Sequence, residues 1–280
     1  MKRLLLVDGS NLLFQMFYGM PSRIIGKDGR QIQGTLGFVG ALLKIIRMTC
    51  PSHIAVFFDG EHENDRAGIL ADYKANRPDY SQMAEEDTPF SQLGDICSAL
   101  DSLGITYTET TDCEADDLIA GYVYKYRERC DIIISSNDSD FFQLIGENVR
   151  VLRYRGDNSV ICNSDYISSK LGIPPERYAE YKSLTGDSAD NIRGCEKVGP
   201  KTAAELVLQF SCIEEMLARC DEIKKPSVRK AVSEAGNRLL LNRSLIKLCE
   251  REELPFDIDR LLYHSKQLST REVLTSIGLF

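Results

Sequence analysis

Short apolar runs alternate with helix-like stretches through the first half of this 280-residue chain. The runs are rich in β-branched residues and lie at 3–7, 53–58, 105–109 and 131–135. The helix-like stretches between them lie at 35–48, 90–103 and 114–127. Buried strands separated by helices predict an α/β fold with a doubly wound, mainly parallel sheet and helices on both faces. We expect an added pair of strands near an edge, at 149–154 and 158–162.

The strand pattern stops at about residue 163, after which the sequence has helical character. We predict a core over 1–185 and a helical region over 186–280. The polar stretch 61–90 directly follows a strand and has no sustained period, which is typical of a functional insertion. With 43% hydrophobic and 27% charged residues, the composition is that of a soluble globular protein.

Several classes of protein can be set aside. No apolar run approaches the ~18 residues of a membrane span. The apolar start of the chain ends at Asp8, too early for a signal peptide, so we expect a cytoplasmic protein. The nine cysteines include no C-x-x-C pair, so a zinc knuckle is not expected. The three histidines are far apart in the sequence, which argues against histidine-centred catalysis.

Carboxylates follow three of the predicted strands where each strand ends, at Asp8, Asp59 and Asp138. The carboxyl ends of parallel strands meet at one edge of a sheet, where ligands bind. Two further acidic clusters are EADD (114–117) and GDSADN (186–191). The first also suits the acidic first turn of an ordinary helix.

If these carboxylates converge, their mutual repulsion would raise their pKa values unless cations neutralise them. Oxygen ligands without His or Cys suit Mg²⁺ or Mn²⁺. A two-metal site about 4 Å across serves in-line attack on phosphodiesters. The candidate metal ligands are Asp8, Asp59, Glu114, Asp116, Asp117, Asp138, Asp140, Asp187 and Asp190.

The formal net charge of −8 at first argues against a polyanionic substrate. Nine of the 42 acidic residues belong to the candidate metal site, however, and the remaining 33 nearly balance the 34 lysines and arginines. The acidic balance therefore does not exclude nucleic acid, although a binding surface must be local.

One local basic candidate lies on the insertion, where Lys74 and Arg77 occur in DYKANRP with Tyr73 beside them and Arg66 upstream. Because the insertion directly follows a candidate metal ligand, these side chains are placed to grip a scissile phosphate. A solvated face is the alternative for every basic group, and we favour it for KKPSVRK (224–230).

A second candidate is GCEKVGPKTAAELV (194–207), a Gly-rich turn that opens a helix at Pro200. Exposed backbone N–H groups and a helix N-terminus make an anion site. A plain connection between two core helices fits this segment equally well. It lacks P-loop spacing, so nucleotide hydrolysis is not expected. The candidate contacts are Gly194, Lys197, Gly199, Lys201 and Thr202.

Six motifs in order resemble the bacterial and phage 5′-nucleases, which comprise the 5′→3′ exonuclease domain of DNA polymerase I and the flap endonucleases. They run from residue 4 to about 207, and the likeness continues to about 259. The motifs are VDGSNLLFQMFYGMP, FFDGEHENDR, DYKANRP, EADDLIAG, SSNDSDFFQL and LTGDSADNIRGCEKVGPKTA.

The resemblance implies a PIN-like α/β core, a helical arch formed by the insertion and a helix–hairpin–helix-type DNA clamp. It places the nine carboxylates at metal-site positions, and Lys74 and Arg77 among arch-base residues that contact the reacting phosphate. The turn 194–202 resembles the hairpin that binds the DNA backbone, which in the family often holds a K⁺ ion.

The sequence departs from the family pattern at three places. Gln15 stands where the family often has arginine, and Tyr18 where it often has histidine. Lys197 replaces the middle glycine of the hairpin. These departures bear on a phosphate contact and on the geometry of the turn.

The implied function is a structure-specific 5′-nuclease, an exonuclease or flap endonuclease that acts on 5′-ended, flap or branched DNA in replication or repair. We expect Mg²⁺ or Mn²⁺ at two or more positions, no membrane contact and no small-molecule cofactor. The sequence ends at Phe280 without a polymerase segment, so we expect a stand-alone nuclease and leave room for a separate polymerase. The alternatives are a PIN-type ribonuclease, a non-catalytic DNA-structure binder and a phosphatase.

Overall fold

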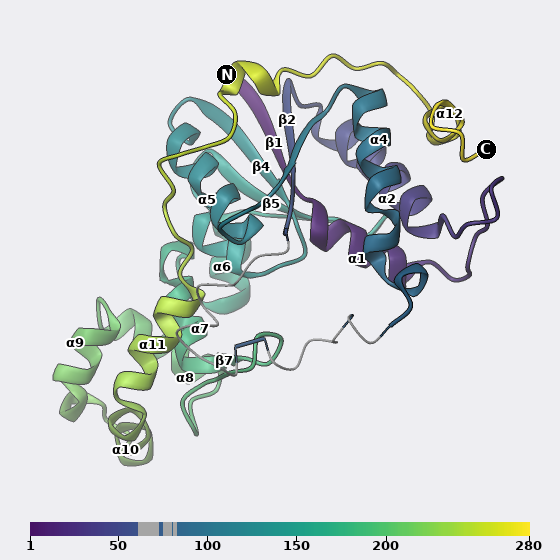
Figure 1. The fold of residues 1–280 in the computed structure, drawn as a ribbon. Helices are drawn as coiled ribbons and strands as arrows, with labels where there is room; N and C mark the ends of the chain where they lie inside the picture. Colours follow the sequence, from purple (N-terminus) through teal and green to yellow (C-terminus); the bar gives the residue numbers. More distant parts are fainter. Residues whose placement is uncertain (61–72, 75–79, 81–82) are drawn as a thin grey trace.

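The fold is built around a six-stranded, mainly parallel sheet (Figure 1). The computed structural model describes residues 1–60, 73–74, 80 and 83–280. The strands are β1 (Lys2–Asp8), β2 (His53–Phe58), β3 (Thr106–Glu109), β4 (Cys130–Ser135), β5 (Val149–Arg153) and β6 (Val160–Cys162). In the order β3-β2-β1-β4-β5-β6, strands β1 to β5 are parallel and β6 is antiparallel to β5. This arrangement confirms the predicted fold class and the added pair at an edge.

The central strand β1 is buried on both faces, which explains its unbroken apolar sequence. Leu4 and Leu6 pack into the core on one side of the sheet. Leu5 packs into the core on the other side, in register with Ile54 of β2 and Ile133 of β4. Successive side chains of a strand alternate between the faces, so one run of leucines supplies both cores.

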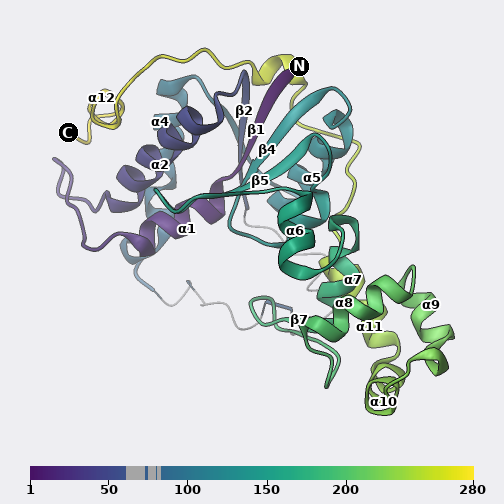
Figure 2. The same ribbon diagram turned by 180° about the vertical axis from the view of Figure 1, so that it is seen from behind.

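Helices cover both faces of the sheet (Figures 1 and 2). One face carries α1 (Gly9–Gly19), α2 (Gln33–Thr49), α4 (Leu93–Leu103) and α12 (Thr270–Ser276). The other carries α5 (Ala115–Tyr126), α6 (Ser164–Leu171) and α7 (Tyr178–Thr185). The carboxyl ends of the central strands point toward the helical region that follows α7 (Figure 1).

The helical region begins with a small hairpin of two strands, β7 (Gly186–Asp187) and β8 (Ile192–Arg193). The helices that follow are α8 (Pro200–Gln209), α9 (Ile213–Ala218), α10 (Pro226–Ala235) and α11 (Asn237–Ile246). Short 3₁₀ helices lie at Glu85–Asp87, Pro89–Gln92, Asp140–Leu144, Pro175–Arg177, Cys220–Glu222 and Ile258–Leu261.

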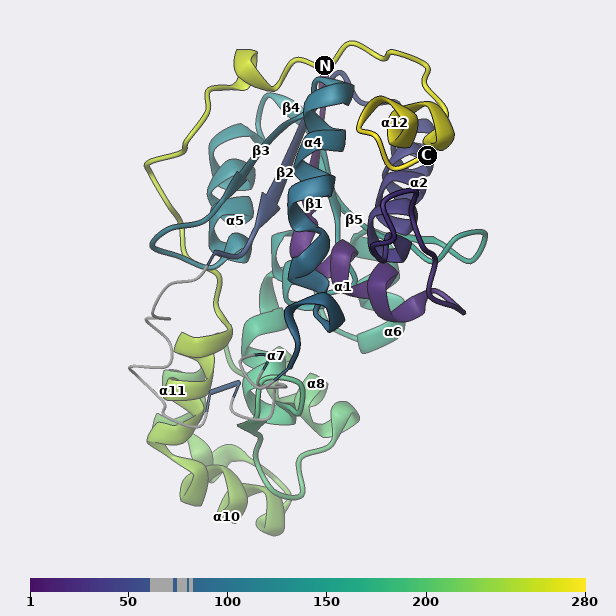
Figure 3. The same ribbon diagram turned by 45° about the vertical axis from the view of Figure 1, so that its right-hand side comes forward.

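After α11 the chain returns to the sheet as an extended strap, residues 247–269, which the sequence did not predict (Figure 3). The Tyr122 hydroxyl of α5 donates to the carbonyl oxygen of Phe256 (2.9 Å) and accepts from its N–H (3.1 Å). The N–H of Tyr263 donates to the carbonyl oxygen of Ser52 (2.9 Å). The strap therefore joins the helical region to the far end of the sheet, where α12 packs on α2 and α4.

The insertion predicted over about 61–90 is described only in part. Arg66 and Arg77 lie outside the described residues. The ring of Tyr80 packs edge-on against Phe14 of α1 and against Phe90, with centroid distances of 5.8 and 5.5 Å. No helix in the described ranges combines the length and the apolar character that crossing a bilayer demands.

Candidate metal centre

Three aspartates lie at or after the ends of the adjacent strands β2, β1 and β4, and each carboxylate accepts a hydrogen bond from a backbone N–H. Asp8 caps α1 by accepting from the N–H of Asn11 (2.9 Å), and its second oxygen accepts from the hydroxyl of Ser136 (2.7 Å). Asp59 accepts from the N–H that begins α5 (2.8 Å). Asp138 accepts from the N–H two residues on (2.8 Å). The strand ends thus orient three carboxylates at one edge of the sheet.

The acidic start of α5 contributes to the same edge. Asp116 lies close enough to Asp8, Asp59 and Asp138 for their charges to act on it. Asp117 is buried and accepts a hydrogen bond from the N–H of Cys249 (2.8 Å). Of the two adjacent aspartates, Asp116 joins the strand-end carboxylates, and Asp117 holds the strap.

Ionising all the carboxylates at this edge of the sheet together is unfavourable. Burial, followed by the charge of Asp59, raises the pKa of Asp8 to about 7. Burial, followed by the charges of Asp8 and Asp138, holds the pKa of Asp116 well above its usual range. A bound cation would offset both effects, because it adds positive charge where several negative charges have lost their water.

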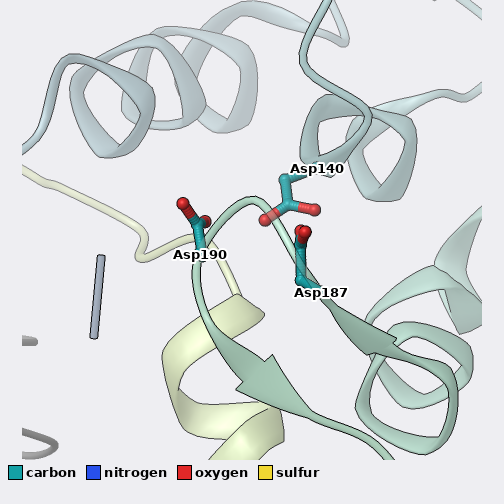
Figure 4. A group of neighbouring side chains, drawn as sticks. All are labelled: Asp140, Asp187 and Asp190. Carbon is teal, nitrogen blue, oxygen red and sulfur yellow. The ribbon is translucent and has the colours of Figure 1, made fainter. Parts of the chain in front are cut away.

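A second group lies where the core meets the hairpin. Asp140, Asp187 and Asp190 each offer one carboxylate oxygen, and these oxygens lie within 4.8 Å of one another. Figure 4 shows that the carboxylates of Asp140 and Asp187 face each other and that Asp190 approaches from the hairpin. In the part of the chain that the structure describes, no other trio of His, Cys, Asp or Glu side chains comes this close.

These three residues fit a hard divalent cation. One oxygen of Asp140 is buried and has no hydrogen-bond partner. Burial and the charge of Asp138 raise the pKa of Asp140 to about 8. An all-oxygen donor set with an unsatisfied carboxylate suits Mg²⁺ or Mn²⁺ better than a soft metal.

A lysine that sequence reasoning missed lies among these acids. The Lys182 ammonium of α7 is 2.6 Å from one oxygen of Asp187 and 3.8 Å from Asp140. It also donates to the hydroxyl of Ser139 (3.3 Å) and lies over the ring of Tyr178. Although burial opposes its charge, these neighbours raise the pKa of Lys182 above the ordinary value.

The described part of the insertion reaches both groups of carboxylates. The Lys74 ammonium forms an ion pair with Glu114, the residue that caps α5. The backbone N–H of Lys74 donates to the carbonyl oxygen of Asp190 (3.1 Å). Tyr73 is buried and packs with Ile192 of the hairpin.

The turn predicted to bind an anion is a close-packed hairpin connection. A Cβ added to Gly194 would lie 2.4 Å from the carbonyl carbon of Thr185, so only glycine fits there. Lys197 adopts the left-handed conformation, with φ 61°. Gly199 caps α8, and Lys201 is exposed on its first turn beside the half-buried Thr202.

Two family models together cover residues 3–269. Residues 3–172 match the N-terminal resolvase-like domain of 5′-3′ exonucleases, and residues 173–269 match the C-terminal SAM fold of 5′-3′ exonucleases. The chain belongs to the 5′-3′ exonuclease family. The family resemblance predicted from the six motifs is thereby confirmed.

Named relatives and solved structures resemble this 5′-3′ exonuclease family member over most of its length. DNA polymerase I of Rhizobium leguminosarum is 34% identical over 264 residues, 91% of this chain but 25% of the polymerase. The chain therefore spans about a quarter of that relative. A 5′-3′ exonuclease of Aquifex aeolicus is 28% identical, covering 99% of this chain and 96% of the relative. The T5 D15 protein co-crystallised with metal ions has the same fold, with a TM-score of 0.70, 22% identity, and coverage of 88% of this chain and 90% of that chain.

Two departures from the family pattern have clear structural settings. Gln15 donates to the carbonyl oxygen of Tyr154 (2.9 Å) and accepts from the Asn137 amide (2.7 Å). It thereby ties α1 to the ends of β4 and β5 without adding positive charge. Tyr18 is exposed, and its hydroxyl lies 3.3 Å from that of Tyr80.

Proposed function

We propose that this 5′-3′ exonuclease family member is a divalent-metal-dependent, structure-specific 5′-nuclease that hydrolyses phosphodiester bonds in 5′-ended, flap or branched DNA. The observation that carries the proposal is the trio Asp140, Asp187 and Asp190, which lies beside the strand-end carboxylates. Asp138 links the two groups, because it accepts from the N–H of Asp140 and its pKa is raised by burial and by Asp190.

We assign two positions for Mg²⁺ or Mn²⁺ to these carboxylates. Asp8, Asp59 and Asp116 would hold one ion, and Asp140, Asp187 and Asp190 the other, with Asp138 between them. Glu114 and Asp117 would act from outside through Lys74 and the strap. Bound ions would add positive charge at the phosphodiester and make the attacking water more acidic.

Lys74 would stabilise the negative charge that develops on the phosphate during cleavage. Its ion pair with Glu114 and its backbone contact to Asp190 support this role, because they hold the residue between the two groups. We assign Arg77 to the same phosphate and Arg66 to the DNA strand, both from the family resemblance. Tyr73 would anchor the insertion on the hairpin.

The turn at 194–202 would bind the backbone of duplex DNA. Gly194 and Gly199 shape it, and Lys197, Lys201 and Thr202 would contact phosphates together with the N-terminus of α8. We also assign a K⁺ ion to the main-chain carbonyls of this turn. The left-handed backbone of Lys197 supports that assignment, because lysine here adopts the conformation that glycine usually takes.

Cleavage of a duplex with a labelled 5′ flap tests the proposal. With Mg²⁺ the protein should release fragments from the 5′ end, and EDTA should abolish their release. Asp140→Asn should remove most turnover while DNA binding stays intact or tightens, because a negative charge is lost. Asp165→Asn is the matched control, since Asp165 is exposed on α6.

Cleavage of the same flap made of RNA, and of the unbranched DNA strand, is compared with cleavage of the DNA flap. The comparison tests the alternatives of a ribonuclease and a non-catalytic DNA binder. Preference for the RNA flap would support the ribonuclease alternative. Tight binding of branched DNA without cleavage in Mg²⁺ or Mn²⁺ would contradict the nuclease proposal and support a DNA-structure binder.

A further inference from the structure

The Lys182 ammonium lies beside Asp140 and Asp187, two of the three carboxylates of the trio. The lysine side chain is 14% exposed, and its ammonium lies 3.8 and 2.6 Å from these two carboxylates. The side chain begins on α7, one element before the hairpin that carries Asp187 and Asp190. The contact is therefore set by the packing of α7 and is protected from water.

Both oxygens of Asp187 are already engaged. One accepts from the N–H of Ala189 (2.9 Å), within the hairpin turn. The other is the oxygen that Lys182 holds at 2.6 Å. A metal ion that takes Asp187 as a ligand therefore binds either the oxygen that the turn backbone already orients or the oxygen beside the ammonium. The oxygen of Asp140 that has no hydrogen-bond partner also lies near the lysine, 3.8 Å from its ammonium.

We propose that Lys182 is a resident counter-ion of this trio that lowers its affinity for a divalent cation, so that the trio fills after the strand-end carboxylates. In the metal-free protein the ammonium would offset the repulsion among the three acids. When a metal enters, the lysine must leave Asp187 or remain as a nearby like charge. Either course costs binding free energy, because unit charges in a partly buried site interact strongly.

The strand-end group differs in this respect. Its nearby lysine, Lys74, forms its ion pair with Glu114, at the edge of the group. The oxygens of Asp8 and Asp59 are held instead by neutral donors: two backbone N–H groups and a serine hydroxyl. Neutral donors orient Asp8 and Asp59 without repelling a cation, so these two carboxylates keep their attraction for metal. The charge of Lys74 acts on Asp116, and it is not among the causes that shift the pKa of Asp8.

Manganese binding without DNA tests the inference. Mn²⁺ is titrated into the DNA-free protein by calorimetry, and the weaker of the resolved affinities is compared among variants. Lys182→Met keeps much of the aliphatic stem and removes the charge, so it should tighten the weaker position by about tenfold or more. Lys182→Arg keeps the charge and should leave it near wild type. Lys170→Met, on the exposed side of α6, is the surface control.

The site of the effect is checked in an Asp190→Asn background. There, Lys182→Met should give little of the gain that it gives in the wild-type background, because one member of the trio is missing. Thermal unfolding provides a second measurement. Without metal, Lys182→Met should have a lower melting temperature than wild type. On adding Mn²⁺, the melting temperature of the variant should rise more than that of wild type.

A role in packing alone predicts a loss of stability that metal does not repair and an unchanged or weaker Mn²⁺ affinity, and that result overturns the inference. If Lys182→Met does not fold without metal, Lys182→Gln provides the same charge removal with a polar end. The inference rests on the proposed metal function, but its test involves no cleavage. An active nuclease with unchanged Mn²⁺ affinity in the variant would refute the counter-ion role alone.

Discussion

The backbone N–H of Lys74 donates a hydrogen bond of 3.1 Å to the carbonyl oxygen of Asp190. The side chain of the same lysine pairs with Glu114, which precedes Asp116 on α5. One residue of the insertion is therefore fixed to the hairpin by its backbone and to Glu114, at the edge of the strand-end group, by its charge. Its backbone is left-handed, with φ 57°, so these contacts hold it in a conformation that lysine rarely adopts.

Replacing Lys74 with alanine should slow single-turnover cleavage of a 5′ flap by roughly 10²-fold or more, the scale of losing one preorganised electrostatic contact. Affinity for the flap should change much less, because the hairpin contacts remain. Rate and binding constant are measured on the same substrate. Lys44→Ala, an exposed substitution on α2, is the control; if both variants cleave alike, the insertion has no part in the chemistry.

The stability of the metal-free protein should fall as pH rises. A carboxyl group whose pKa is raised by folding favours the folded state below its unfolded pKa and loses that contribution as pH rises through the folded value. The folded values are about 7 for Asp8 and about 8 for Asp140, against 3.8 for the unperturbed group. Melting temperatures in EDTA should therefore decline between about pH 4 and about pH 8, and saturating Mg²⁺ should flatten the decline.

Asp140→Asn separates this effect from titration elsewhere in the molecule. An asparagine cannot ionise, so the variant should lose less stability than wild type over the upper part of that pH range in EDTA. If stability depends on pH in the same way in the variant and the wild type, the ionisation of Asp140 does not contribute to that dependence. Asp165→Asn again serves as the exposed control.

Lys201→Ala should weaken binding to duplexes of different sequence by similar factors, because backbone contacts carry no base information. The slope of log affinity against log salt should lose about one unit in magnitude. Fluorescence anisotropy over a salt series measures both. Glu205→Gln lies one turn along the same helix and should not reduce affinity; an effect of Lys201→Ala on only one sequence would point to base recognition.

Two glycines of the same turn should respond differently to alanine. A Cβ at Gly194 would lie 2.4 Å from the backbone of Thr185, whereas a Cβ at Gly199 would meet nothing within 4 Å. We expect Gly194→Ala to cost about 1–3 kcal/mol of unfolding free energy or more, as overpacking does. Gly199→Ala, with φ −83°, should be nearly neutral. Urea denaturation of both variants makes the comparison, and equal stabilities would contradict the close packing of the hairpin.

Much of this architecture was predictable from local sequence. The unbroken apolar run of β1 predicted a strand buried on both faces, and the aspartate that ends it predicted a ligand at the edge where parallel strands finish. Such signals are local, because a few consecutive residues are enough to predict a strand and the side chain at its end. The sequence identified Asp140, Asp187 and Asp190 as candidate ligands, but it could not show that their oxygens lie close together. That proximity depends on how α7 packs against the core.

Lys182 and the strap could not be predicted in the same way. A single lysine in a helix has the same local pattern whether it faces water or a carboxylate trio. Asp116 and Asp117 are adjacent acids in one helical turn, yet only Asp116 joins the strand-end group, because Asp117 binds the N–H of Cys249 more than a hundred residues away. Contacts over such separations are set by tertiary packing and have no periodic signal.

The position of α12 sets the order in which one side of the core is completed during synthesis. The strands of the sheet and the carboxylates of both groups leave the ribosome well before residues 270–279, yet Val273, Leu274 and Leu279 belong to the core beneath α2 and α4. The surfaces of α2 and α4 on which α12 packs stay exposed until that helix emerges. The two family models meet near residue 172, yet Ile167 and Tyr178 on either side of it belong to one hydrophobic core. A fragment cut there would therefore leave apolar surface exposed.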